Sequence, residues 1–134
     1  MASAGFSSCG SPSDVVQVPA LTLSPDPPQP GYNLTVDFDA TVSDVIQVGA
    51  YIWVEVKLGY IVLIRKTFDL CEQATQLDAQ YECPLAAGDY TVHHEIELPK
   101  EIPPGKFVVT AKGHNPDDSP LFCVKEDISF RKSA

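Results

Sequence analysis

The sequence predicts an all-β fold, an immunoglobulin-like antiparallel β-sandwich of about seven strands. The first observation is a series of short segments in which apolar and polar side chains alternate, separated at regular spacing by turn residues. The second is a proline content of 12 in 134 residues, which disfavours long helices. The third is the length, which fits one domain, so we take residues 1–134 as a single domain and residues 1–8 as a flexible N-terminal arm.

The expected strands follow one another along most of the chain. The clearest, residues 33–42, alternates apolar and polar side chains from Leu34 to Val42. Residues 15–23 contain a proline, so we expect them at the edge of a sheet. Residues 71–80 are the one segment expected to form a short helix. The remaining expected strands are residues 50–58, 60–69, 90–98, 106–114 and 121–130.

Composition and charge exclude several classes of protein. Hydrophobic residues make up 44% of the chain and charged residues 20%, which is ordinary for a globular protein and argues against disorder. Nine basic and eighteen acidic side chains give a net charge of −9, which repels phosphate backbones and excludes nucleic acid as an expected partner. No apolar run approaches the roughly 18 residues that a membrane-spanning helix needs.

The four cysteines indicate an oxidising compartment. Cys9, Cys71, Cys83 and Cys123 form no C-x-x-C pair, and an even number in a small proline-rich chain is typical of disulfides. Four cysteines allow three connectivities. Cys71 and Cys83 flank one short polar segment, which favours a local bridge and leaves Cys9 to pair with Cys123. The alternative is four buried free thiols in a cytosolic protein.

Two short motifs bear on the compartment. Met1 is followed directly by Ala2-Ser3-Ala4, with no basic region and no apolar stretch, so we expect no signal peptide within this sequence. The Ala-Ser-Ala triplet has the form found before a signal-peptidase cut. Asn33-Leu34-Thr35 is a glycosylation sequon, although it also fits an ordinary strand start. We therefore expect a secreted or lumenal protein, in a vacuole- or lysosome-like compartment, with Asn33 as a candidate glycosylation site.

No constellation of residues indicates catalysis or metal binding. In His93-His94-Glu95, a strand would place His93 and Glu95 on one face and His94 on the other. Two ligands are fewer than the three or four that a zinc site needs, so we expect no metal. The sequence lacks G-x-S-x-G, H-E-x-x-H and a Gly-rich phosphate loop, so we expect neither an enzyme nor a cofactor.

The interior of the sandwich has two possible arrangements. Sheets that pack about 10 Å apart fill the gap with side chains. Sheets that splay leave an apolar cavity that can hold a lipid. The periodicity does not separate the two arrangements, and taken alone it favours the filled core.

Several motifs resemble one known family in their order and spacing. They are Cys9-Gly10, Ser24-Pro25-Asp26-Pro27-Pro28-Gln29-Pro30-Gly31, Phe68-Asp69-Leu70-Cys71-Glu72, Cys83-Pro84-Leu85, the run from Leu98 to Phe107 and Leu121-Phe122-Cys123. From Cys9 to about Phe130 the chain resembles the ML domain, a family of secreted lipid-recognition proteins, and within it the branch of fungal phospholipid transfer proteins. One departure is the loop Asp26-Pro27-Pro28-Gln29-Pro30, which lacks the cysteine of a third bridge found in many animal members.

The resemblance implies a fold and a function. It implies two sheets with a lipid cavity between them, no catalysis, and the bridges Cys9–Cys123 and Cys71–Cys83. The expected function is a monomeric carrier that takes up a sterol or a phosphatidylinositol- or phosphatidylglycerol-type phospholipid. It would pass this lipid to a membrane or to a lipid-accepting protein during transient contact. The alternative is a secreted interaction or immunomodulatory module whose pocket is incidental.

Inward-facing side chains on neighbouring strands are the expected cavity lining. Ala111 lies where the animal sterol carriers, which the chain resembles, carry a bulky aromatic residue, and this implies extra room for a bulkier or two-chained ligand. His94, on the apolar face of its strand, is either a pH switch for ligand exchange or a hydrogen-bonded core histidine. The expected lining residues are Phe38, Val54, Val56, Ile64, Val92, His94, Ile96, Phe107, Val109, Ala111, Phe122 and Val124.

Overall fold

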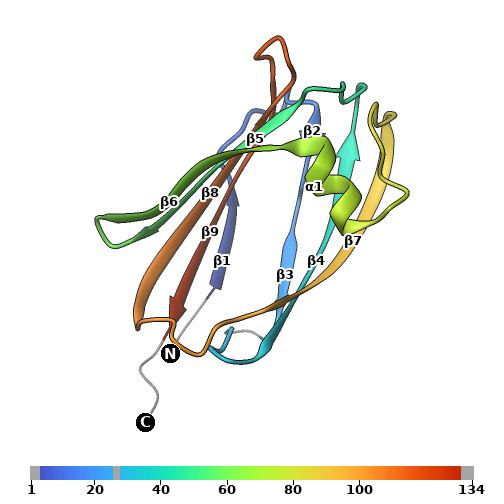
Figure 1. Ribbon diagram of the computed structural model, residues 1–134. Coiled ribbons are helices and arrows are strands. Elements are labelled where there is room, and N and C mark those ends of the chain that lie inside the picture. Colours follow the sequence, from blue (N-terminus) through green and yellow to red (C-terminus); the bar gives the residue numbers. More distant parts are fainter. Residues whose placement is uncertain (1–3, 26–27, 131–134) are drawn as a thin grey trace.

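Two antiparallel sheets face each other in a computed structural model that describes residues 4–25 and 28–130 (Figure 1). Sheet A has the strand order β1-β9-β8-β5-β6. In sheet B, β4 pairs with β7 along one side and with β2 and β3 along the other. The elements are β1 (Ala4–Ser8), β2 (Val16–Gln17), β3 (Leu21–Ser24), β4 (Asn33–Val42), β5 (Tyr51–Leu58), β6 (Ile61–Asp69), α1 (Leu70–Leu77), β7 (Gly88–Glu97), β8 (Gly105–His114) and β9 (Pro120–Phe130). The predicted all-β sandwich is confirmed.

Two parts of the chain differ from the expected elements. Ala4–Ser8 forms strand β1 instead of a flexible arm, because the edge of β9 offers free backbone groups with which it pairs. The expected strand 15–23 is divided into β2 and β3, because Pro19 has no N–H to donate to a ladder. These two differences raise the strand count from about seven to the nine that the structure describes.

The two ends of the sandwich are built differently. We call the end that carries α1, at the top of Figure 1, the helix end, and the opposite end, below it, the far end. A cluster of buried side chains lies at the helix end, where Leu121 is fully buried and Ala50 almost so. Its other members are Val16, Ala40, Val42, Ile46 and Leu70.

Helix α1 connects the edge of sheet A to sheet B. It begins after Asp69, whose Oδ1 accepts a hydrogen bond from the backbone N–H of Glu72 at 3.0 Å. The helix lies across the gap between β6 and β7 in Figure 1. Within the described part of the chain, no helix combines the length and apolarity needed to cross a bilayer.

Candidate functional site

An apolar cavity of about 260 Å³ lies between the two sheets at the helix end. Its wall comes from both sheets, from α1 and from the loops that follow β4 and α1. The residues of the wall are Phe6, Val16, Val18, Leu21, Phe38, Ala40, Val42, Ile46, Ile52, Leu70, Gln73, Ala74, Leu77, Tyr81, Leu85, Tyr90, Val92, Phe122 and Val124.

The structure divides the residues expected to line a cavity into two groups. Phe38, Val92, Phe122 and Val124 lie on the wall. The others are on strands that supply the inner faces of the sheets, but they are not part of the wall: Val54, Val56, Ile64, His94, Ile96, Phe107, Val109 and Ala111.

The far end of the interior contains an aromatic pair. The rings of Phe107 and Phe130, both on sheet A, meet edge to face, with 5.4 Å between their centres. Both side chains are buried, as are Leu34 and Leu23 on sheet B. None of these four residues belongs to the cavity wall, so the same alternation of apolar residues lines the cavity at one end and not at the other.

Helix α1 supplies wall residues that strand periodicity could not indicate. Leu70, Gln73, Ala74 and Leu77 all lie on the wall, at the i, i+3, i+4 and i+7 spacing of one helix face. That spacing is visible in the sequence and is the signal that would have revealed them. The wall also includes Phe6 of β1, which was expected to belong to a flexible arm.

A glycine on β8 makes room for one aromatic side chain of the wall. Gly113 pairs with Phe122 across the ladder, and a Cβ atom at Gly113 would collide with the Phe122 ring. The ring therefore lies against the backbone of β8 while forming part of the wall.

The cavity is almost free of polar groups. The hydroxyl of Tyr81 donates to the carbonyl of Thr91 at 2.9 Å, and the hydroxyl of Tyr90 donates to the carbonyl of Ala86 at 2.5 Å. Among the described residues, Gln73 is the remaining wall residue with a polar side chain. Such a wall can accommodate an apolar chain by burying it, and it presents no acid–base or nucleophilic pair for catalysis.

Both disulfides lie at the helix end. The structure forms Cys71–Cys83 and Cys9–Cys123, the two bridges expected from the sequence. Cys71 directly follows Leu70 of the wall, and Cys123 lies between Phe122 and Val124, which both belong to the wall.

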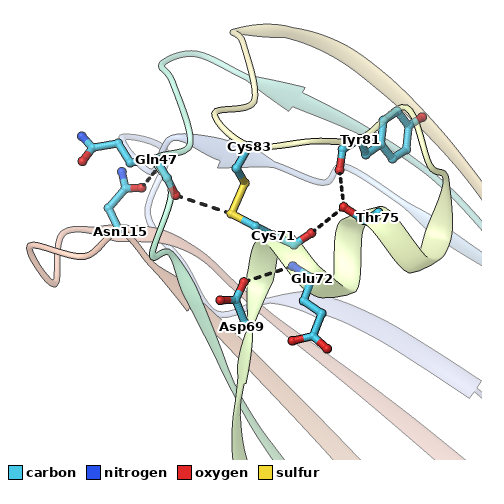
Figure 2. The surroundings of a disulfide bond; sticks show 8 residues. All are labelled: Gln47, Asp69, Cys71, Glu72, Thr75, Tyr81, Cys83 and Asn115. Atoms are coloured by element: carbon cyan, nitrogen blue, oxygen red, sulfur yellow. Dashed lines mark hydrogen bonds between the residues drawn. A yellow bond between two sulfur atoms is a disulfide. The ribbon is translucent and has the colours of Figure 1, made fainter.

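Figure 2 shows polar contacts around the Cys71–Cys83 bridge. The Sγ of Cys71 lies 3.6 Å from the carbonyl oxygen of Gln47, whose own N–H donates to Oδ1 of the buried Asn115 at 3.0 Å. The Oγ1 of Thr75 lies 3.0 Å from the carbonyl oxygens of both Cys71 and Tyr81. These contacts fix α1 and the segment after it as one side of the cavity.

The β5–β6 hairpin extends away from sheet B and carries exposed apolar residues (Figure 1). Tyr60 at its tip is fully exposed. The four residues that follow, Ile61, Val62, Leu63 and Ile64, are also exposed. A contiguous exposed apolar patch of this kind is typical of a surface that contacts a membrane or another protein.

Charged residues on the outer face stabilise the hairpin. The side chain of Arg65 donates from Nε to Glu55 Oε2 at 2.8 Å, and Lys57 Nζ lies 3.7 Å from Glu55 Oε1. The hydrogen bond from Arg65 is the main reason that the pKa of Glu55 is lowered from its ordinary value, and desolvation opposes this effect.

The remaining sequence candidates lie away from the cavity wall. His93 contacts Asp37 on the neighbouring strand, with 2.5 Å between Nδ1 and Oδ1. His94 is half-buried and lies two positions after Val92 of the wall. Over the described ranges, no three side chains of His, Cys, Asp or Glu gather as a metal site would require. Asn33 is exposed at the first residue of β4.

Comparison with known proteins gives the family. The profile of the ML domain matches residues 3–130. A phosphatidylglycerol/phosphatidylinositol transfer protein of Mycosarcoma maydis is 49% identical over 125 residues, which are 93% of this chain and 65% of that protein. A protein of the same name from Cryptococcus neoformans is 43% identical over 124 residues, covering 92% of this chain and 69% of that protein. The chain thus spans about two thirds of the length of these relatives.

A solved structure supports the fold. The crystal structure of a Niemann-Pick type C2 protein from the Japanese carpenter ant superposes with a TM-score of 0.66 at 19% identity, covering 95% of this chain and 99% of that one. At this identity the likeness concerns the fold alone. The match to the family profile covers nearly the whole chain, and two antiparallel sheets form a sandwich as that resemblance implied. The chain belongs to the ML domain family.

Proposed function

We propose that the protein is a non-catalytic lipid carrier that holds the acyl part of its ligand in the cavity at the helix end. The observation that carries this proposal is the cavity itself, whose wall is apolar apart from Gln73 and two tyrosines with engaged hydroxyls. Apolar burial is the main source of affinity for such a chain. The names of the relatives favour a phosphatidylglycerol- or phosphatidylinositol-type phospholipid over a sterol.

The size of the cavity bears on how the ligand is held. A volume of about 260 Å³ is close to the lower end of the roughly 300–1,000 Å³ typical of small-molecule sites. The cavity as described therefore holds part of an acyl chain, and a two-chained lipid requires the sheets to separate further. We place this separation at β6 and β7, because the described ladders pair β6 only with β5 and β7 only with β4, so no backbone pairing joins the two sheets there.

The exposed hairpin is the surface that we assign to transient contact with a membrane. Tyr60 to Ile64 form its apolar tip, and Lys57, Arg65 and Lys66 flank that tip in a chain that is otherwise strongly acidic. Apolar side chains bordered by cations suit the interface of an anionic bilayer. A lipid-accepting protein would use the same patch, so contact with a protein is the alternative that the hairpin also supports.

The two disulfides favour a compartment of the secretory pathway. We assign the protein to a secreted or lumenal location, acting as a monomer. The exposed position of Asn33 at the start of β4 leaves space for a glycan. A mass shift after treatment of the native protein with an N-glycosidase tests whether Asn33 carries a glycan.

The test of the carrier function compares two tryptophan substitutions on α1. Ala74 lies on the cavity wall, whereas Gln76 on the same helix is exposed and lies off the wall. Native mass spectrometry after incubation with phosphatidylglycerol vesicles should show bound lipid on the wild type and on Gln76→Trp, and little on Ala74→Trp, because the indole fills the cavity. A wild-type protein that takes up neither phospholipid nor sterol refutes the carrier and leaves the interaction module as the remaining function.

A further inference from the structure

Lys66 interrupts the apolar inner face of sheet A at the level of the cavity. The register of the sheet aligns Val124 of β9, Ala111 of β8, Val54 of β5 and Lys66 of β6 in one row. Residues that pair directly across strands point to the same face of a sheet. Since Val124 lies on the cavity wall, Lys66 shares the inner face with the wall and ends this row at the edge strand.

The ammonium of Lys66 leans toward the helix end. Its Nζ lies 5.1 Å from the centre of the Phe68 ring, and Phe68 pairs in register with Ile52 of the wall. The ion pairs of the described residues do not include Lys66. The other two cations of the hairpin, Lys57 and Arg65, both contact the carboxylate of Glu55.

Lys66 is the one lysine or arginine on the inner face of either sheet among the described residues. The carboxylate on this face, Glu126, lies three strands away on β9 and one row nearer the far end, since it pairs with Val109. Gln73, the amide of the cavity wall, belongs to α1, which directly follows β6. An anionic head group is therefore favoured at the β6 edge and disfavoured at the β9 side.

We propose that Lys66 binds the phosphate of a phospholipid whose acyl chain occupies the cavity, so that the protein selects phospholipids over neutral lipids. This inference rests on the proposed carrier function. The Lys66 side chain is exposed, and its ammonium can donate charge-assisted hydrogen bonds to phosphate oxygens while its Nζ stays over the Phe68 ring. Lys66 shares its row with Val124 of the wall and lies on β6, the strand that α1 directly follows.

The experiment measures a ratio of two lipids bound from the same vesicles. The vesicles contain phosphatidylglycerol and diacylglycerol with identical acyl chains, and native mass spectrometry gives the ratio of the two complexes. A change in membrane docking alters delivery of both lipids and leaves the ratio unchanged. We expect Lys66→Gln to lower the ratio of phosphatidylglycerol to diacylglycerol about tenfold, and Lys66→Arg to keep most of it.

Lys112→Gln is the matched control, because the Nζ of Lys112 also lies over an aromatic ring, 5.4 Å from the centre of the Trp53 ring, but on the outer face of sheet A. Its ratio should equal that of the wild type. An unchanged ratio in Lys66→Gln, or an equal fall in Lys112→Gln, overturns the assignment of Lys66. Displacement of bound phosphatidylglycerol by soluble glycerophosphoglycerol also overturns the proposal. The head group alone would then account for binding, and the acyl chain in the cavity would not be needed. If the wild type binds neither lipid, the carrier function itself is refuted.

Discussion

The two ends of the sandwich interior use the same kind of residues with different results. At the far end Phe107 and Phe130 of sheet A meet edge to face, with 5.4 Å between ring centres, and both rings are buried. At the helix end an apolar cavity of about 260 Å³ lies between the two sheets. The helix end also has the cluster of buried side chains, both disulfides and the polar contacts around Asn115.

The difference shows how a small domain can keep a hollow interior. Atoms that border empty space lose dispersion contacts on one side, so a cavity lowers stability. Cross-links that restrict the unfolded chain offset that loss without filling the cavity. On this view the two disulfides beside the cavity offset the stability that the cavity costs.

The largest effect should come from removing the bridge with the longer loop. Cys9 and Cys123 are 114 residues apart in sequence, and loop entropy predicts a loss of about 4.7 kcal/mol in the double serine variant. The Cys71–Cys83 bridge, with a separation of 12, should contribute about 3 kcal/mol. Urea unfolding measures both values. Two variants as stable as the wild type would contradict the view that cross-links support the hollow end.

A pair of truncations then separates the far end from the cavity. Phe107→Ala removes a buried ring and should lower the free energy of unfolding by about 3–5 kcal/mol. The lipid affinity of the folded variant should change little. Leu77→Ala on the cavity wall removes a partly exposed side chain, so it should lower stability less and lipid affinity more. Urea unfolding and native mass spectrometry provide the two readouts. Equal changes in both variants would remove the distinction between the ends.

A single methyl group at Gly113 should disturb the hollow end alone. In Gly113→Ala the new Cβ displaces the Phe122 ring, which lies on the wall, so we expect a loss of about 1–3 kcal/mol and weaker lipid binding. Gly5→Ala is the control, because a Cβ atom there has no neighbour within 4 Å. In calorimetry and in lipid-uptake measurements, Gly5→Ala should be close to the wild type. A Gly113→Ala protein with unaltered lipid uptake would contradict the position of Phe122 on the wall.

The smallest effect concerns the hairpin, which belongs to neither end. The pKa of Glu55 is lowered chiefly by the hydrogen bond from Arg65, so this contact stabilises the fold above the ordinary pKa of a glutamate. The stabilisation is lost as the pH falls through the lowered pKa. Arg65→Gln should therefore be slightly less stable than the wild type at neutral pH and equal to it in strong acid. Thermal unfolding across that pH range gives the comparison, and a constant difference at every pH would exclude the contact as its cause.

The sequence predicted the sheets better than the space between them. Alternation identified the strand from Asn33 to Val42 and the inner face of β9, because a period of two fixes the face to which each side chain points. It contains no information on the spacing of the sheets, so Phe107 at the far end and Phe122 on the cavity wall looked equivalent. The spacing depends on how side chains of the two sheets fit together, and that is a property of the assembled fold.

The edge elements were the least predictable part. β1 contains small residues apart from Phe6, and its strand forms only because β9 offers an edge. In β6 the run Ile61 to Ile64 has no alternation, and a register shift after Val56 changes which of its residues face inward. The inner position of Lys66 therefore emerges from the ladder and not from the pattern of the sequence.

The most direct test of the account locates the lipid inside the protein. A phosphatidylglycerol with a nitroxide at the end of one acyl chain broadens NMR signals of nearby groups, and methyl-labelled protein provides probes at both ends. The account predicts the strongest broadening at Leu77, Val92 and Val124 of the cavity wall, and weaker broadening at Leu34 of the far end. Stronger broadening at Leu34, or at Ile61 of the hairpin, than at the wall residues would contradict a lipid site at the helix end.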